Sequence, residues 1–301
     1  MDRLEHLRVL VAVADSGGLA AAARRLGHSP PAVTRAVAQL EQRIGAQLLV
    51  RTTRHVRLTD AGERFVADAR RILAELDEAE ALAGGAFREP QGLLSITASS
   101  MFGRLHVAPL VLDYLDQHPR VQVRTLFVDR IVHLVDEGYD VAVRIAHLPD
   151  SGLTAVRVGA VRRVIVASPA YLAARGEPRS AQDLATHVGI GFTQSGGPAA
   201  PWALYPGGRR EPVELVTPLV ANTGEMAIAA AVAGRGLTQA LSYQVADEVA
   251  AGRLRIVLAD QEPPPIPVHV VYPAGRKAAA KVRAFINLAV GHLRGQPALQ
   301  N

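Results

Sequence analysis

Apolar residues recur at helical spacing through the start of the chain, and short turns separate the runs. The first run ends at the Ser-Gly-Gly turn of residues 16–18, a sequence typical of a helix end. An alanine-rich run over residues 19–26 predicts a second helix, which Gly27 can cap. Ser29 suits the N-cap of a third helix, and Pro30 suits its first position. Two short helices joined by a glycine-containing turn are typical of the helix-turn-helix motif.

Residues 48–59 predict a short strand, a polar basic tip and a returning strand, an arrangement known as a β-wing. Wing arginines suit the narrow, electronegative minor groove of DNA, and hydroxyl groups suit phosphate. The first turn of the third helix carries small or hydrogen-bonding side chains, as a helix that enters the major groove requires. Arg35 could bind either guanine or phosphate, and the sequence leaves both open. The candidate DNA-contacting residues are Ser29, Pro30, Pro31, Ala32, Thr34 and Arg35 in the helix and Arg51, Thr52, Thr53 and Arg54 in the wing.

Charge is distributed unevenly along the chain. Residues 1–60 contain nine arginines and five acidic residues, whereas residues 61–90 contain four arginines and seven acidic residues. The formal net charge of the whole chain is +5, and Lys277 and Lys281 are its only lysines. A basic head indicates a polyanionic partner, and arginine contacts phosphate and guanine in a planar, bidentate manner. The alternative is that the arginines reflect only the base composition of the source genome.

Residues 60–83 predict a long helix. Asp60 begins it, and Glu63, three residues later, completes a capping box. Its apolar side chains alternate spacings of four and three residues, which is typical of a helix that pairs with another helix. This seam consists of Phe65, Ala69, Ile72, Leu76, Ala79 and Ala83. The pattern favours pairing with a second copy of the chain, and the alternative is packing against its own domain. Gly84, Gly85 and Pro90 then close the segment as a hinge.

From residue 91 onward, short apolar strands alternate with amphipathic helices, which predicts an α/β fold with largely parallel sheets. The predicted strands cover residues 93–98, 121–128, 140–145, 163–167, 188–192, 237–241 and 268–272. The predicted helices cover residues 104–117, 131–137, 169–174, 224–234 and 276–293. The proline-rich run of residues 262–267 indicates a stiff connection. Together with a turn near residue 161, it predicts two crossovers between two subdomains, so that the last strand and helix return to the first.

Residues 1–88 resemble the DNA-binding and linker segment of the LysR-type bacterial transcriptional regulators. The matching segments are Leu19 to Leu26, Ser29 to Arg35, Leu40-Glu41, Gly45, Leu48-Leu49, Arg51-Thr52 and Leu58 to Gly62. The chain departs from the family pattern at Pro30, where glutamine is frequent, and at Thr34, where serine is usual. Thr34 keeps the hydroxyl, whereas Pro30 removes an amide that could read a base. The resemblance extends more loosely to the body, through residues 168–172, Asn222, residues 234–236 and residues 252–254.

The resemblance implies an N-terminal all-α winged helix-turn-helix, a long linker helix and a C-terminal effector domain of two subdomains, similar in fold to periplasmic binding proteins. The expected domains are residues 1–59, 60–90 and 91–301, with subdomain I formed by residues 91–161 and 267–301 and subdomain II by residues 162–266. It also implies double-stranded promoter or operator DNA, a small-molecule effector and RNA polymerase as partners. A homo-oligomer is expected, at least a dimer, and the resemblance favours a tetramer; no cofactor and no metal are expected.

In an open α/β sheet, ligands bind beyond the carboxyl ends of the strands, near helix N-termini. In this chain the rule selects the polar and small residues that directly follow predicted strands or begin the next helix. They are Ser99, Ser100, Val128, Asp129, Thr193, Gln194, Asn222 and Thr223. We therefore expect these residues to line an effector cleft between the subdomains. The alternative for each is a helix cap or a turn, where serine, threonine, asparagine and aspartate are common.

The sequence lacks motifs that would indicate an enzyme. It has no cysteine, which excludes a cysteine nucleophile and thiolate zinc sites, and no P-loop, nucleophile elbow or His-Glu-x-x-His motif is present. The alternative to a regulator is a solute-binding protein or small-molecule enzyme fused to a helical head, in which the basic wing and the helical seam would have no role. No apolar run is long enough to span a membrane, and the N-terminus is too charged for a secretory signal. We expect a cytoplasmic protein without a membrane partner.

Overall fold

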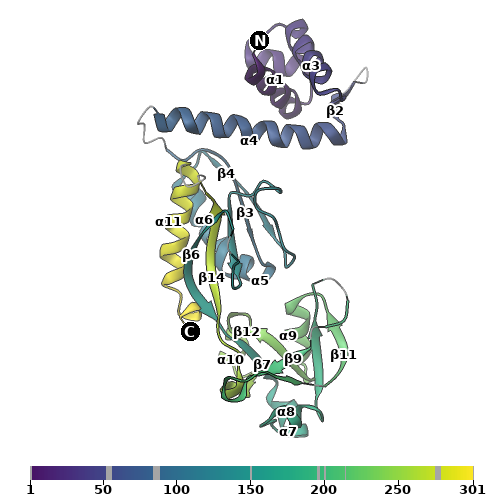
Figure 1. Ribbon diagram of the computed structural model, residues 1–301, viewed down its shortest axis with the longest axis vertical. Coiled ribbons are helices and arrows are strands. Elements are labelled where there is room, and N and C mark those ends of the chain that lie inside the picture. The colour runs from purple at the N-terminus through teal and green to yellow at the C-terminus, as the bar shows by residue number, and fades with distance from the viewer. Residues whose placement is uncertain are drawn as a thin grey trace. The chain divides into compact units, whose positions relative to one another are not determined.

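The computed structural model describes residues 2–51, 56–83, 89–149, 151–194, 197–199, 201–213, 215–274 and 279–300. The chain forms two compact units, residues 1–88 and residues 89–301 (Figure 1). Within the described ranges, no helix combines the length and the apolar character that a membrane span needs.

The first unit is a winged helix-turn-helix, as predicted. Its elements are α1 (Arg3–Ser16), α2 (Leu19–Leu26), α3 (Pro30–Ile44), β1 (Leu49–Arg51), β2 (Val56–Leu58) and α4 (Asp60–Ala83). Gly27 ends α2 in the left-handed conformation, which glycine adopts without steric cost. The first three helices enclose a core that includes Leu10, Val33 and Leu40, none of them accessible to solvent. The wing strands pair antiparallel, with Val50 opposite Arg57. Thr52, Thr53 and Arg54, predicted for the wing tip, lie outside the described residues.

The start of α4 is capped differently from the prediction. The Gly62 amide donates to the Thr59 hydroxyl at 2.9 Å, and the Glu63 amide donates to the Thr59 carbonyl at 2.8 Å. Thr59 is therefore the N-cap, and the predicted capping box of Asp60 and Glu63 is wrong. The Thr59 hydroxyl also donates to the Gln47 carbonyl at 2.8 Å. One side chain thus joins the residue before the wing to the helix after it.

The predicted seam of α4 is divided between two surroundings. Ala69 is buried in the core of its own unit, and Phe65 packs against that core from a half-buried position. At this end of the helix the alternative of packing within the domain holds. Ile72 remains 40% exposed and Leu76 is half-buried, so this stretch of the seam is not covered by the unit itself. The side chains of Ala79 and Ala83 lie outside the described residues.

The second unit contains two five-stranded sheets of matching topology. The first sheet has the order β4-β3-β5-β14-β6 and the second has the order β11-β8-β12-β7-β13. The first consists of β3 (Gly92–Ala98), β4 (Val121–Phe127), β5 (Val141–Ile145), β6 (Leu153–Val161) and β14 (Ile266–Pro273). The second consists of β7 (Arg163–Ala167), β8 (Val188–Phe192), β11 (Val216–Ala221), β12 (Leu237–Leu241) and β13 (Arg255–Val257). A separate hairpin joins β9 (Trp202–Leu204) to β10 (Glu211–Val213).

Both sheets are mixed, so the prediction of largely parallel sheets holds only in part. In each sheet three strands pair parallel, and the other two pair antiparallel to their neighbours. Parallel neighbours need long crossover connections. The two sheets themselves are joined by short segments. The chain passes from β6 of the first sheet into β7 of the second through Arg162, and it returns from β13 to β14 through residues 258–265. These are the two expected crossovers.

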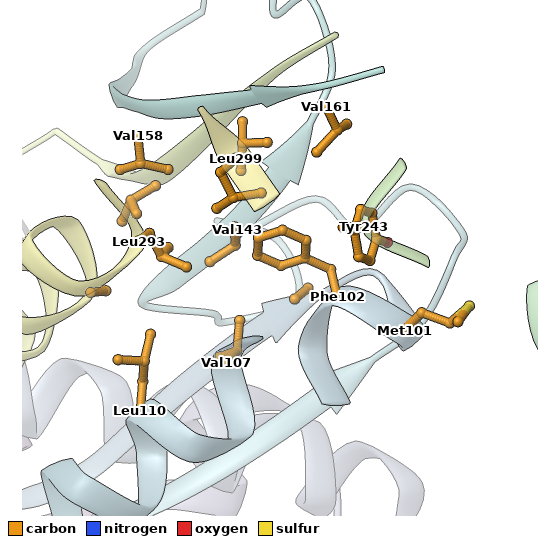
Figure 2. Packing of buried hydrophobic residues seen from close by; sticks show 14 of the residues in the cluster. Met101, Phe102, Val107, Leu110, Val143, Val158, Val161, Tyr243, Leu293 and Leu299 are labelled. Carbon is orange, nitrogen blue, oxygen red and sulfur yellow. The ribbon is translucent and has the colours of Figure 1, made fainter. Parts of the chain in front are cut away.

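The helices of the second unit pack on the sheets. They are α5 (Ser100–Phe102), a π-helical turn (Gly103–Val107), α6 (Ala108–Gln117), α7 (Pro169–Arg175), α8 (Ala181–Leu184), α9 (Gly224–Val232), α10 (Ala246–Ala250) and α11 (Ala280–Arg294). Short 3₁₀ turns cover Pro206–Gly208, Ser242–Gln244, Ala259–Gln261 and Pro297–Leu299. Helices α6 and α11 lie together against the first sheet, and α9 lies against the second (Figure 1). Phe102 lies in the core between Val143 and the ring of Tyr243, which it meets edge to face at 5.2 Å (Figure 2).

The helix predicted over residues 131–137 is absent, because a side-chain network holds this segment as a turn. The Arg130 guanidinium donates to both carboxylate oxygens of Glu137, at 2.9 and 2.6 Å. The His133 amide donates to the same carboxylate at 3.0 Å. Gly138 then adopts φ of +72° and ends the turn. The strands β6, β9, β10, β11 and β13 were not predicted.

Candidate functional site

The first turn of α3 presents small side chains to solvent, and the one polar side chain among them, that of Ser29, has no hydrogen-bond partner in the described part of the chain. Ser29 is the N-cap by position, yet its side chain makes no capping hydrogen bond. An N-cap side chain normally accepts from the second or third helical amide, and the second residue here is Pro31, which has no N–H. Ser29, Pro30 and Pro31 are exposed, and Ala32 is half-buried. This turn is therefore open to a ligand.

Thr34 and Arg35 lie one turn further along α3, and they differ in whether their side chains are hydrogen-bonded to described residues. The Thr34 hydroxyl donates to the Pro30 carbonyl at 3.0 Å, which leaves its oxygen only as an acceptor. Arg35 is exposed and forms no hydrogen bond or ion pair with any described residue. By contrast, Arg25 and Arg70 both pair with Asp15. Arg35 is thus a cation next to the exposed turn that no described residue neutralises.

The wing is fastened to α3 by a carboxylate inside the domain. One oxygen of Glu41 accepts hydrogen bonds from the amides of Leu48 and Leu49, at 2.8 and 3.0 Å. Both leucines are buried, so these amides have no access to water. Exposed Arg57 lies on the returning strand. The Arg51 side chain lies outside the described residues, although its backbone belongs to β1. The arrangement fixes where the wing leaves the helical core.

The second unit contains a cavity of about 880 Å³ between its two sheets. Four of the eight predicted effector residues line it, namely Ser99, Val128, Asp129 and Gln194. The polar residues that line it and were not predicted include Arg144, His147, Arg163, Gln239, Tyr243 and Gln244. Exposed aliphatic side chains complete one part of the wall: Ile131 is 79% exposed, and Val135 is 59% exposed. Polar and apolar ligand groups would both find complementary surfaces here.

The other four predicted residues do not line this cavity. They lie at helix starts and strand ends, in line with the alternative that such residues cap helices or form turns. Thr223 caps α9 by accepting from the Met226 amide at 3.3 Å, and Asn222 occupies the exposed bend before it. The Ser100 amide donates to Asp129 at 3.0 Å, and the Ser100 hydroxyl is 3.4 Å from the Phe127 carbonyl. The Thr193 amide donates to the Ala221 carbonyl at 2.9 Å. These residues hold strand ends and helix starts in place.

Half-buried Arg144 and buried Tyr243 both line the cavity, and burial shifts the pKa of each. Arg144 extends from β5, and its guanidinium donates to the Val132 carbonyl at 2.8 Å. Burial lowers the pKa of Arg144, which indicates a cation held in partly dry surroundings. Burial raises the pKa of Tyr243, so its hydroxyl stays a neutral hydrogen-bond donor. The hydrogen bonds from Arg130 hold the pKa of Glu137 at about 2, so the adjoining turn keeps its ion pair throughout the physiological pH range.

Sequence comparison identifies both units. Residues 4–63 match the model of the bacterial regulatory helix-turn-helix protein, lysR family, and residues 87–294 match that of the LysR substrate binding domain. The chain is 36% identical to the transcriptional regulator PtxR of Pseudomonas aeruginosa, across 98% of this chain and 94% of that one. It is 33% identical to the regulator CrgA of Neisseria meningitidis across 96% of each chain.

Solved structures show the same architecture. The structure of CrgA, a LysR-type transcriptional regulator from Neisseria meningitidis, matches with a TM-score of 0.62 at 31% identity, over 97% of this chain and 99% of that one. The full-length structure of AphB, the Vibrio cholerae virulence activator, matches with a TM-score of 0.62 over 97% of this chain and all of that one. At 24% identity, the likeness to AphB is one of fold alone.

Proposed function

The chain belongs to the LysR family of bacterial helix-turn-helix transcriptional regulators, and from this premise we propose which residues bind DNA and which bind the effector. We assign DNA recognition to residues 1–59, subunit pairing to residues 60–90 and effector binding to residues 91–301. In the last, residues 91–161 and 267–301 form one subdomain and residues 162–266 the other. Because DNA is the target, we place the protein in the cytoplasm. The relatives that span both units are named as regulators, which favours binding over catalysis.

The observation that carries the DNA-binding proposal is the exposed first turn of α3, with the neighbouring Arg35. The side chains of Ser29 and Arg35 are exposed, and neither makes a hydrogen bond or ion pair with a described residue. An exposed helix N-terminus with a free guanidinium suits the major groove. The acceptor oxygen of Thr34 can take a hydrogen bond from a base amino group. The wing residues Arg51 to Arg54 are proposed to contact the neighbouring minor groove and phosphates.

Arg35→Ala should weaken binding to a preferred DNA duplex by about 1–3 kcal/mol if the guanidinium reads a base. The matched control is Arg43→Ala, because Arg43 is exposed on the same helix about 12 Å further along it. Duplexes selected from a random pool by each full-length variant provide the measurement. The Arg35 variant should lose preference at one position in each half-site, and the Arg43 variant should keep the wild-type consensus. A consensus that shifts with Arg43 and not with Arg35 would refute the placement of α3.

We propose that the cavity binds the effector, with Ser99, Asp129 and Gln194 among the groups that contact it. A ligand that binds one arrangement of the two subdomains more tightly shifts the population toward that arrangement. The direct crossovers at Arg162 and at residues 258–265 allow the subdomains to rotate about two short segments. Because α4 joins the two parts of the chain, such a shift would alter the spacing or bend of bound DNA.

We further propose that α4 pairs with a second copy through Ile72 and Leu76, which gives at least a dimer. Ile72→Glu would place a charge in that pairing surface, where an unpaired buried charge is strongly unfavourable. Sedimentation velocity should show a smaller species than the wild type. Ala67→Glu is the control, since Ala67 is exposed on the opposite face of α4. An unchanged assembly in the Ile72 variant would exclude this seam as the interface.

A further inference from the structure

A smaller cavity adjoins the effector cavity beside the two crossovers. Its volume is about 350 Å³, and it shares His147, Arg163, Gln239 and Ile266 with the larger one. Arg210 and Tyr205 complete its polar wall. The described residues that line it include neither aspartate nor glutamate. We name this space the basic recess.

The two arginines of the recess each belong to a pair of consecutive arginines. Arg162 donates to both carboxylate oxygens of Glu262 at 3.2 Å, whereas Arg163 lines the recess. In the same way, Arg209 lies 3.7 Å from the Glu211 carboxylate, whereas Arg210 lines the recess. Among the residues that the structure describes, Arg163 and Arg210 have no ion-pair partner. Glu262 and Glu211 thus pair with the arginines outside the recess, and no carboxylate in the described part of the chain pairs with the two that line it.

The walls of the recess are held by rigid elements. Arg163 is the first residue of β7, in register with Leu241 of β12. Arg210 directly precedes β10, whose hairpin is anchored by buried Trp202 and Leu204. The Tyr205 amide donates to the Gln261 carbonyl at 2.8 Å, and Pro263 and Pro264 line the same wall. The backbones that carry Arg163 and Arg210 are thus held in place, and both exposed guanidinium groups line the same recess, where a planar anion can accept hydrogen bonds from them.

We propose that the basic recess binds the carboxylate of the effector and that the apolar body of the same molecule extends into the larger cavity. This proposal rests on the proposed effector function and names the chemical class of the ligand. A carboxylate matches the guanidinium fork and replaces the missing acidic partner. Leu148, beside His147 on the wall of the larger cavity, and the shared Ile266 provide apolar contact next to the recess. A compact inorganic anion would leave that surface unused.

Calorimetric titration of the full-length protein with hexanoate, benzoate, their neutral amides and inorganic phosphate tests the proposal. At least one carboxylate should bind about tenfold or more tightly than its amide, since a charge-assisted hydrogen bond is lost in the amide. Arg210→Gln and Arg163→Gln should each bring the carboxylate down to the affinity of the amide. Arg209→Gln is the matched control, because Arg209 is adjacent in sequence and 86% exposed outside the recess. It should change the affinity less than twofold, as expected for an exposed pair.

Several outcomes would overturn the assignment: no binding by either carboxylate, equal binding of carboxylate and amide, or equal losses in the Arg209 and Arg210 variants. Phosphate that binds as tightly as the carboxylates would overturn the role of the apolar body.

Circular dichroism of each variant verifies its fold. DNA binding by the same preparations separates the two hypotheses. If the protein binds DNA normally but shows none of the expected carboxylate binding, only the proposed carboxylate site is refuted. If the protein does not bind DNA, the proposed function itself is refuted.

Discussion

Glu41→Leu is expected to destabilise the wing by about 2–6 kcal/mol, because it leaves two buried amides without an acceptor at about 1–3 kcal/mol each. Those amides belong to Leu48 and Leu49, which are 1% and 4% exposed and donate to one Glu41 oxygen. Hydrogen–deuterium exchange of the full-length protein measures the local opening free energy. Peptides from residues 47–58 should exchange much faster, and the affinity for DNA should fall with them.

Glu41→Gln is the matched variant, since its side-chain carbonyl can accept the same two hydrogen bonds without the negative charge. It should retain most of the protection that the leucine variant loses. If the leucine variant keeps wild-type exchange in the wing, the carboxylate does not hold the wing. If glutamine and leucine behave alike, the charge is what matters and not the acceptor geometry.

Gly62→Ala is expected to displace the wing or the start of α4, at a cost of about 1–3 kcal/mol or more. A Cβ at Gly62 would lie 2.0 Å from the Leu48 carbonyl oxygen and 2.9 Å from its carbon. The obstructing atoms belong to the backbone, so a side-chain rotation cannot relieve the clash. The variant should melt at a lower temperature and bind DNA more weakly than the wild type.

Gly18→Ala is the control in the same unit, because a Cβ there meets no atom within 4 Å and the φ angle of −178° is ordinary extended backbone. It should cost about 0.5–1 kcal/mol, because Gly18 is the N-cap of α2 and alanine is a poorer N-cap than glycine, and it should leave the wing in place. Equal melting temperatures for the Gly62 variant and the wild type would show that the wing can move away from α4 at little cost.

The first unit was predictable because its helices and turns are specified locally. The Ser16–Gly18 turn, Gly27 and Pro30 mark element ends that the structure reproduces. The structure also explains why a few residues, Glu41 and Gly62 among them, carried the family resemblance. They join α3, the wing and α4 through hydrogen bonds and close backbone contact. Such constraints permit few substitutions.

The second unit was predicted less completely because its site depends on tertiary contacts. The rule of strand ends selected Ser99, Asp129 and Gln194, which lie within two residues of a strand end and line the cavity. It could not identify Arg144, which lies within β5, or Arg163, which follows a crossover. The one signal in the sequence that could have identified Arg144 was its position as an arginine inside an otherwise apolar strand. The turn of residues 131–137 has helical periodicity in sequence, and only the Arg130–Glu137 pair shows that it does not form a helix.

The most direct test of the account is a titration of the full-length protein with two labelled duplexes over a range of salt concentrations. One duplex carries the consensus selected from a random pool, and the other is its scrambled counterpart. We expect the selected duplex to bind at least about 10³-fold more tightly. Its log affinity should fall steeply with log salt, by roughly 0.9 for each phosphate contact. Equal affinity for the two duplexes, or an affinity that salt does not change, would contradict the account.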